Sequence, residues 1–134
     1  MANNLAAIIA LLLATAAQGD GAAIYQDSCA ACHGADLEGA PDWRVQNLDG
    51  SFPAPPHDAS GHTWHHDDTM LFEYTKIGGA EKLKQMGVGS VVSGMPAFGE
   101  QLTDPEITSV LKYIKSTWPE KIRNHQKLIT ENSQ

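Results

Sequence analysis

The stretch Cys29-Ala30-Ala31-Cys32-His33 decides how this sequence is interpreted. Two thiols three residues apart, at the end of a short helical segment, lie on one face, and a histidine follows directly. The pattern C-x-x-C-H is typical of covalent haem attachment, with the histidine directed at the iron. A thioredoxin-like redox pair, half of a zinc site and a structural disulfide are the alternatives. Haem attachment is favoured because the flanks are helical rather than βαβ, and because the chain has only 2 cysteines.

A second iron ligand is expected in the segment G-M-P-A-F, residues 94–98. Met95 lies there between a glycine and a proline, in a stiff loop that can hold a thioether sulfur against iron. Histidine and methionine together are the ligands of cytochromes c, and the soft sulfur raises the reduction potential. Met70 falls inside a helical pattern and is expected to pack in the core. Met86, in a glycine-rich segment, is the reserve candidate.

With these two motifs, residues 20–118 resemble a small soluble class I cytochrome c. In that resemblance Cys29, Cys32, His33 and Met95 fall on the haem-binding positions. The resemblance implies an all-α class I cytochrome c fold, with a few helices around one covalently bound haem c. It also implies a long irregular loop that wraps the haem, and iron ligated by His33 and Met95.

The C-terminal part of this region carries clear helix signals. Thr103 and Glu106 form a capping box, and an apolar stripe at helical spacing runs from Ile107 to Ile114. Pro119 ends the helix. We therefore predict one amphipathic helix from residue 104 to about residue 118.

A short N-terminal helix is expected to cross this C-terminal helix. Gly21 and Tyr25 lie four residues apart and so share one face. In the resembling family a small residue and an aromatic residue form such a crossing, and Val110 and Tyr113 would be their partners. These residues hold the fold and carry no chemistry.

The segment from Gly34 to His66 contains few secondary-structure signals and four prolines. Loops of this length usually serve a function, and wrapping the haem edge would be one. Within it, Asp49-Gly50 between apolar residues indicates a small β-hairpin. A further helix is predicted from Asp67 or 68 to about residue 78.

Three parts are predicted along the 134 residues. Residues 1–17 have the apolar stretch and small residues of a signal peptide, although residues 1–4 lack a basic side chain. Residues 18–118 form the cytochrome c domain. Residues 119–134 are a polar extension, either a further helix on the domain or a frayed end, with the helix favoured. Cleavage and haem attachment both fit a bacterial periplasmic protein, and retention as a short anchor is the alternative.

Charge is uneven along the chain. Residues 20–68 carry nine acidic side chains against Arg44 alone, and residues 69–134 carry seven acidic against eight basic side chains, giving the net charge of −7. Nucleic acid and anionic membrane surfaces are therefore unlikely partners, because both repel acidic proteins. Redox proteins with basic docking patches are expected as partners, and a monomer is expected.

Four histidines of the long loop form a conspicuous cluster: His57, His62, His65 and His66. Their spacing is compatible with a copper or zinc site, or with a pH-sensitive docking patch. We favour a structural role for the cluster, in which the imidazoles contact haem propionates or cap the following helix. Trp43, Arg44 and Trp64 are the candidates for propionate contact, with a solvated surface charge as the alternative for Arg44.

Three functions compete. An electron carrier needs six-coordinate iron, whereas a haem enzyme or sensor needs an exchangeable sixth ligand. A metal-binding module would use the loop from His57 to His66. The stiff loop around Met95 and the single C-x-x-C-H motif favour the non-enzymatic electron carrier.

Overall fold

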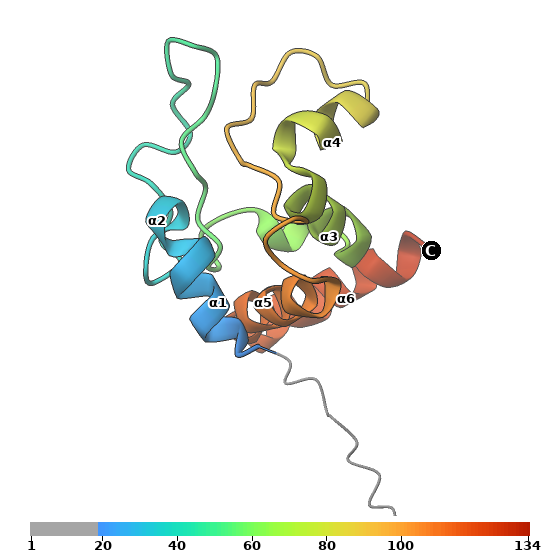
Figure 1. The fold of residues 1–134 in the computed structure, drawn as a ribbon. Coiled ribbons are helices and arrows are strands. Elements are labelled where there is room, and N and C mark those ends of the chain that lie inside the picture. The colour runs from blue at the N-terminus through green and yellow to red at the C-terminus, as the bar shows by residue number, and fades with distance from the viewer. Residues whose placement is uncertain (1–18) are drawn as a thin grey trace, which may run out of the picture.

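The computed structural model describes residues 19–134 and is all-α (Figure 1). Within these residues no strand is formed, and none of the helices is long and apolar enough to cross a membrane. The predicted signal peptide, residues 1–17, lies outside the described residues. In chain order the elements are α1 (Gly21–Ser28), α2 (Ala30–His33), the 3-10 helix η1 (Thr63–His65), α3 (Asp68–Ile77), α4 (Gly79–Gln85), α5 (Asp104–Ser116) and α6 (Glu120–Asn132).

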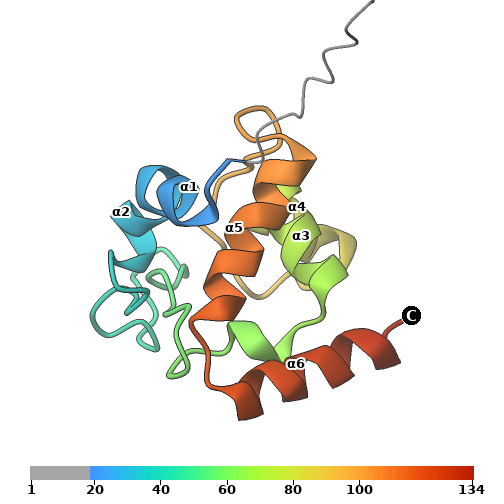
Figure 2. The same cartoon turned by 90° about the horizontal axis from the view of Figure 1, so that it is seen from below.

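The central element is α5, which contacts α1 on one side and α3 on the other (Figure 2). Its start is fixed by the predicted capping box, since Thr103 accepts from the Glu106 backbone N–H and the Glu106 carboxylate accepts from Thr103. Ile107, Val110 and Ile114 are buried along one stripe. The predicted helix is thus confirmed, and its apolar face organises the domain.

The contact between α1 and α5 depends on Gly21. A Cβ placed on Gly21 would lie 2.8 Å from the carbonyl carbon of Ser109 and 3.0 Å from Cβ of Tyr113. Only glycine lets the two helices approach this closely. One turn later, the rings of Tyr25 and Tyr113 pack at 5.6 Å between centroids. The predicted crossing is therefore present.

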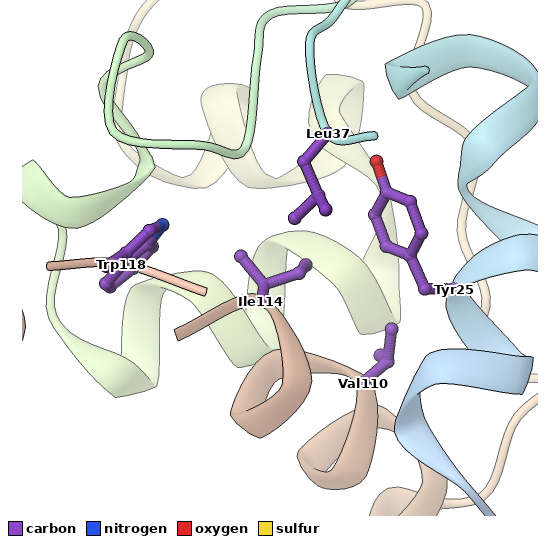
Figure 3. Packing of buried hydrophobic residues seen from close by; sticks show 5 residues of the cluster. All are labelled: Tyr25, Leu37, Val110, Ile114 and Trp118. Atoms are coloured by element: carbon purple, nitrogen blue, oxygen red, sulfur yellow. The ribbon is translucent and has the colours of Figure 1, made fainter. Parts of the chain in front are cut away.

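A compact cluster of apolar side chains fills the space beside this crossing (Figure 3). Tyr25 and Trp118 lie at its two ends, and Leu37 and Ile114 lie between them. The indole N–H of Trp118 donates to the His57 carbonyl oxygen at 2.7 Å. The end of α5 is thereby tied to the long loop that follows α2.

The predicted β-hairpin around residues 45–52 is wrong. The Asn47 N–H does donate to the Ser51 carbonyl oxygen at 2.8 Å, so a tight turn exists, but no strands flank it. Val45 and Leu48 are 63% and 110% exposed, so the segment has no apolar face packed on a core. An isolated two-stranded hairpin is at best marginally stable without such a face. Ser51 instead forms a single parallel bridge with Val92.

The C-terminal extension forms α6, as favoured from the sequence, and this helix packs across η1 (Figure 2). Gln126 is 2% exposed and donates to the His66 carbonyl oxygen at 3.1 Å and to the Asp68 carboxylate at 2.7 Å. The Asp68 N–H donates to the Thr130 hydroxyl at 3.1 Å. The extension thus holds the histidine-rich segment through hydrogen bonds as well as packing.

Candidate functional site

The two thiols of the C-x-x-C-H motif lie at α2, which follows α1 after a break at Cys29. Neither thiol forms a disulfide; Cys29 is half-buried and Cys32 is exposed. Burial, assisted by the neighbouring Cys32, raises the pKa of the Cys29 thiol to about 11. Because no disulfide joins the two cysteines, both sulfurs are free for covalent attachment to another group.

The imidazole of His33 is buried and held in one tautomer. Its Nδ1 lies 2.8 Å from the Pro55 carbonyl oxygen, which can only accept a hydrogen bond, so Nδ1 carries the proton. Burial lowers the pKa of His33 and outweighs the opposite effect of this hydrogen bond. In the neutral ring, Nε2 then has a free lone pair. Such an outer hydrogen bond is how proteins orient a histidine that ligates a metal.

The Pro55 carbonyl reaches His33 because the long loop folds back on itself. Leu37 adopts a left-handed conformation, with φ of 64°, and its carbonyl oxygen accepts from the His57 N–H at 2.8 Å. Gly39 lies directly against the backbone of Pro56, where a Cβ would come within 2.8 Å of the proline ring. These close contacts fix the segment around residue 55 beside α2.

The ring of His57 stacks on the ring of His33. Their centroids lie 3.9 Å apart and the planes differ by 25°. Burial, with smaller contributions from His33 and His62, lowers the pKa of His57 to about 3. Its Nδ1 lies 2.8 Å from the Thr63 hydroxyl, and that hydroxyl donates to the Pro56 carbonyl oxygen at 3.4 Å.

Met95 lies in a loop fastened to α3 and α4. Its carbonyl oxygen accepts from the Gly79 N–H at 3.0 Å, and its N–H donates to the Ser93 hydroxyl at 3.3 Å. The Tyr74 hydroxyl from α3 donates to the same serine at 2.9 Å. The half-buried Met95 is thus held by its backbone, which leaves the thioether free to act as a ligand.

The structure brings Trp43 and Arg44 together but separates Trp64 from them. The Arg44 guanidinium lies over the Trp43 ring at 4.2 Å, and Trp43 stacks on His62 at 5.6 Å. Trp64 instead packs against His65 and against His125 of α6, and its N–H donates to the Ala59 carbonyl oxygen at 3.3 Å. Propionate contact remains a prediction for these three residues.

The four loop histidines do not converge on one point. His57 faces His33, His62 lies between Trp43 and His66, and His65 faces Trp64. Among residues 19–134, no group of three or more His, Cys, Asp or Glu side chains is arranged to hold a metal ion. The helix cap expected from this cluster is also absent, since Asp67 accepts from the Met70 N–H and caps α3 itself.

Comparison with known proteins fits this geometry. The family model for cytochrome c matches residues 19–118, which contain both thiols, His33 and Met95. The chain belongs to the cytochrome c family. It is 32% identical over 98 residues to the gluconate 2-dehydrogenase cytochrome c subunit of Pantoea cypripedii. That match covers 73% of this chain and 20% of the relative, so the chain spans about a fifth of the relative's length. No solved structure is significantly similar to the chain.

Membership of the cytochrome c family implies covalently bound haem c, and the residues present fit this group. Two unpaired thiols, a neutral imidazole with one free nitrogen and a loop methionine are its expected donor set. The loop between α2 and η1 and the loop between α4 and α5 reach the same end of the molecule (Figure 1), where Ser51 of the first loop bridges Val92 of the second. Apart from Leu128, the exposed large apolar side chains of the described residues all lie on these loops. They are Val45, Leu48, Phe52, Met86, Val91 and Val92.

Sequence reasoning missed Pro55, His57 and Ser93 as individual supports of the cytochrome c site. Pro55 and Ser93 act through a carbonyl and a hydroxyl on irregular backbone, for which the sequence offers no signal. His57 was recognised only as part of a histidine cluster. Its neighbour Pro56 restricts the backbone, but nothing in the sequence indicates that the loop returns to His33.

Proposed function

We propose that this cytochrome c is a one-electron carrier with a single haem c, attached through Cys29 and Cys32 and ligated by His33 and Met95. The observation that carries the proposal is the state of His33: buried and neutral, with its Nδ1 proton committed to Pro55. Nε2 is thereby prepared as a ligand, and the two free thiols lie in the same short segment.

The haem iron supplies the redox chemistry when it is bound, by alternating between Fe(II) and Fe(III). The residues of the chain hold and tune the site without forming or breaking substrate bonds. Pro55 fixes the tautomer of His33. Gly79 and Ser93 hold the backbone of Met95, so that its thioether would remain on the bound iron and would keep small molecules away from it. The proposed carrier is therefore not an enzyme.

The proposed partners are redox proteins, and the charge distribution supports partners with basic docking patches. Residues 20–68, which include the attachment motif, carry a net charge of −8, from nine acidic side chains and one basic. Complementary charge speeds the encounter of such proteins. The relative belongs to a gluconate 2-dehydrogenase, which supports a dehydrogenase as the class of electron donor. We propose that the carrier works as a monomer in the bacterial periplasm.

The test is the absorption spectrum of the haem-loaded protein in its oxidised and reduced forms. The proposal predicts low-spin haem with a positive midpoint potential and a weak near-infrared sulfur-to-iron band in the ferric form. The band should disappear in Met95→Ala and persist in the matched control Met86→Ala, whose side chain is 52% exposed.

Other outcomes point to the competing functions. High-spin ferric haem, or ready binding of carbon monoxide at neutral pH, would mean an exchangeable sixth position and would favour an enzyme or sensor. Loss of the band in Met86→Ala instead of Met95→Ala would move the ligand to the reserve methionine. Tight stoichiometric copper binding by the loop from His57 to His66 would favour a metal-binding module.

A further inference from the structure

The hydrogen bond to Pro55 fixes where Nδ1 of the His33 ring points, but it does not fix the plane of the ring. A single N–H···O contact does not prevent the imidazole from turning about the line that joins the two atoms. The stacked ring of His57 blocks this rotation, because its face lies parallel to the face of His33 within 25° at a centroid distance of 3.9 Å. Two independent contacts therefore define the plane of His33.

His57 is itself held from three sides. Its N–H donates to the Leu37 carbonyl oxygen at 2.8 Å, and its carbonyl oxygen accepts from the Trp118 indole at 2.7 Å. Its ring is oriented by the Thr63 hydroxyl, 2.8 Å from Nδ1. Trp118 is 1% exposed and belongs to the core cluster. The position of His57 is therefore set by the core of the domain and by η1, and not by the exposed loop.

We infer that His57 is a positioning residue that sets the plane of the His33 imidazole. This inference rests on the proposed function, in which His33 ligates the iron. A planar side chain is required at position 57, because an aliphatic residue of similar size fills the space without a flat face parallel to His33. Thr63 is a second positioning residue, since its hydroxyl fixes the orientation of the His57 ring.

The orientation of an imidazole ligand, together with that of a methionine ligand, determines how unpaired spin would be distributed over ferric haem. The paramagnetically shifted haem-methyl proton resonances therefore report the plane of the His33 ring, and a change that lowers stability without turning this ring does not move them. The inference predicts that His57→Ala changes the spread of these resonances. His57→Phe should restore part of the wild-type pattern, because the phenyl ring keeps a flat face against His33 although it loses the contact with the Thr63 hydroxyl.

Matched controls come from His65, which stacks on Trp64 at 3.8 Å and not on His33. His65→Ala and His65→Phe should both leave the haem-methyl pattern unchanged. If His57→Ala does not incorporate haem, a second pair of variants, at Thr63, tests the inference. Thr63→Ser keeps the hydroxyl and should keep the pattern, whereas Thr63→Val leaves Nδ1 of the half-buried His57 without its partner and should change it.

The failures of the two proposals are distinguishable. A wild-type protein without the near-infrared band of methionine ligation would overturn the proposed His/Met carrier before any variant is made. With that band present, the inference about His57 is overturned if His57→Ala has the wild-type haem-methyl pattern. It is also overturned if His57→Phe departs from the wild-type pattern as far as His57→Ala does, or if Thr63→Val matches Thr63→Ser.

Discussion

Replacing Gly21 by alanine should separate the two helices on which the domain is built. The atom nearest to the added Cβ would be the Ser109 carbonyl oxygen, and the Ser109 carbonyl carbon would lie 2.8 Å away, whereas ordinary van der Waals contact begins near 3.4 Å, a shortfall of at least 0.6 Å (3.4 − 2.8). The obstacle is the backbone of α5 and the Cβ of Tyr113, so no flexible side-chain end can move aside. Relief therefore requires α1 to shift away from α5.

The cost of this shift follows from the residues at the crossing. Overpacking a well-packed contact typically costs about 1–3 kcal/mol. Gaps of roughly 0.5–1 Å forfeit a quarter to a half of the dispersion energy of the atoms concerned. Tyr25 and Val110, which are 0% and 1% exposed, are the side chains that would lose contacts. Alanine regains at most about 1 kcal/mol of helix propensity, which leaves a net loss of stability of about 0–2 kcal/mol, and the clash with the α5 backbone places it toward the upper end.

Guanidinium unfolding of the haem-loaded protein, followed by circular dichroism, measures this loss as a lower midpoint. Gly89→Ala is the matched control, since nothing lies within 4 Å of its Cβ position and its φ is not in the left-handed region. The control should be neutral or slightly stabilising. A Gly21→Ala protein that unfolds at or above the wild-type midpoint would refute the close crossing of α1 and α5.

Two further predictions concern the attachment of α6. Gln126→Leu should destabilise the protein by roughly 1–3 kcal/mol in the same unfolding assay, because it removes the hydrogen bonds that the buried Gln126 amide donates to the His66 carbonyl and the Asp68 carboxylate, whereas Gln101→Leu at an exposed position should not. Burial raises the pKa of Asp68, but hydrogen bonds from Lys115 and Gln126 outweigh it and hold the pKa below the ordinary value of 3.8. The stability that Asp68 contributes is therefore complete well above pH 3.8 and is lost as pH falls through the folded-state pKa. Wild type and Asp68→Asn should accordingly differ most in urea unfolding near neutral pH and converge as pH falls below the folded-state pKa of Asp68; a constant difference would contradict this.

The elements predicted correctly from the sequence are those fixed by neighbouring residues. The capping box that begins α5 lies within four residues, and Asp67 caps α3 by the same local chemistry. Gly21 and Tyr25 share a face because of helical spacing alone. The hairpin prediction was wrong because a turn such as Asp49-Gly50 does not by itself supply the packed face that strands need.

The site was predicted less completely than the fold. The donor atoms on Cys29, Cys32, His33 and Met95 are carried by side chains of recognisable chemistry. Their supports are backbone carbonyls, a serine hydroxyl and a stacked ring, brought in by loops without periodicity. The extension after residue 118 had an apolar pattern too weak to show that Gln126 would be its buried residue.

His57 shows why such supports escape a sequence pattern and still matter to the chemistry. It lies 24 residues after His33 in the sequence. Two hydrogen bonds bring it back to His33: its N–H donates to the Leu37 carbonyl oxygen, and its carbonyl oxygen accepts from the indole of Trp118, just after α5. Every one of these contacts depends on the tertiary fold. The plane of the His33 ring is therefore determined by the same core that Gly21 allows to form. A variant that loosens the crossing of α1 and α5 should therefore disturb the haem-methyl resonances as well as the stability. Gln126→Leu, which removes hydrogen bonds between α6 and the segment at the start of α3, should reduce the stability and disturb those resonances less.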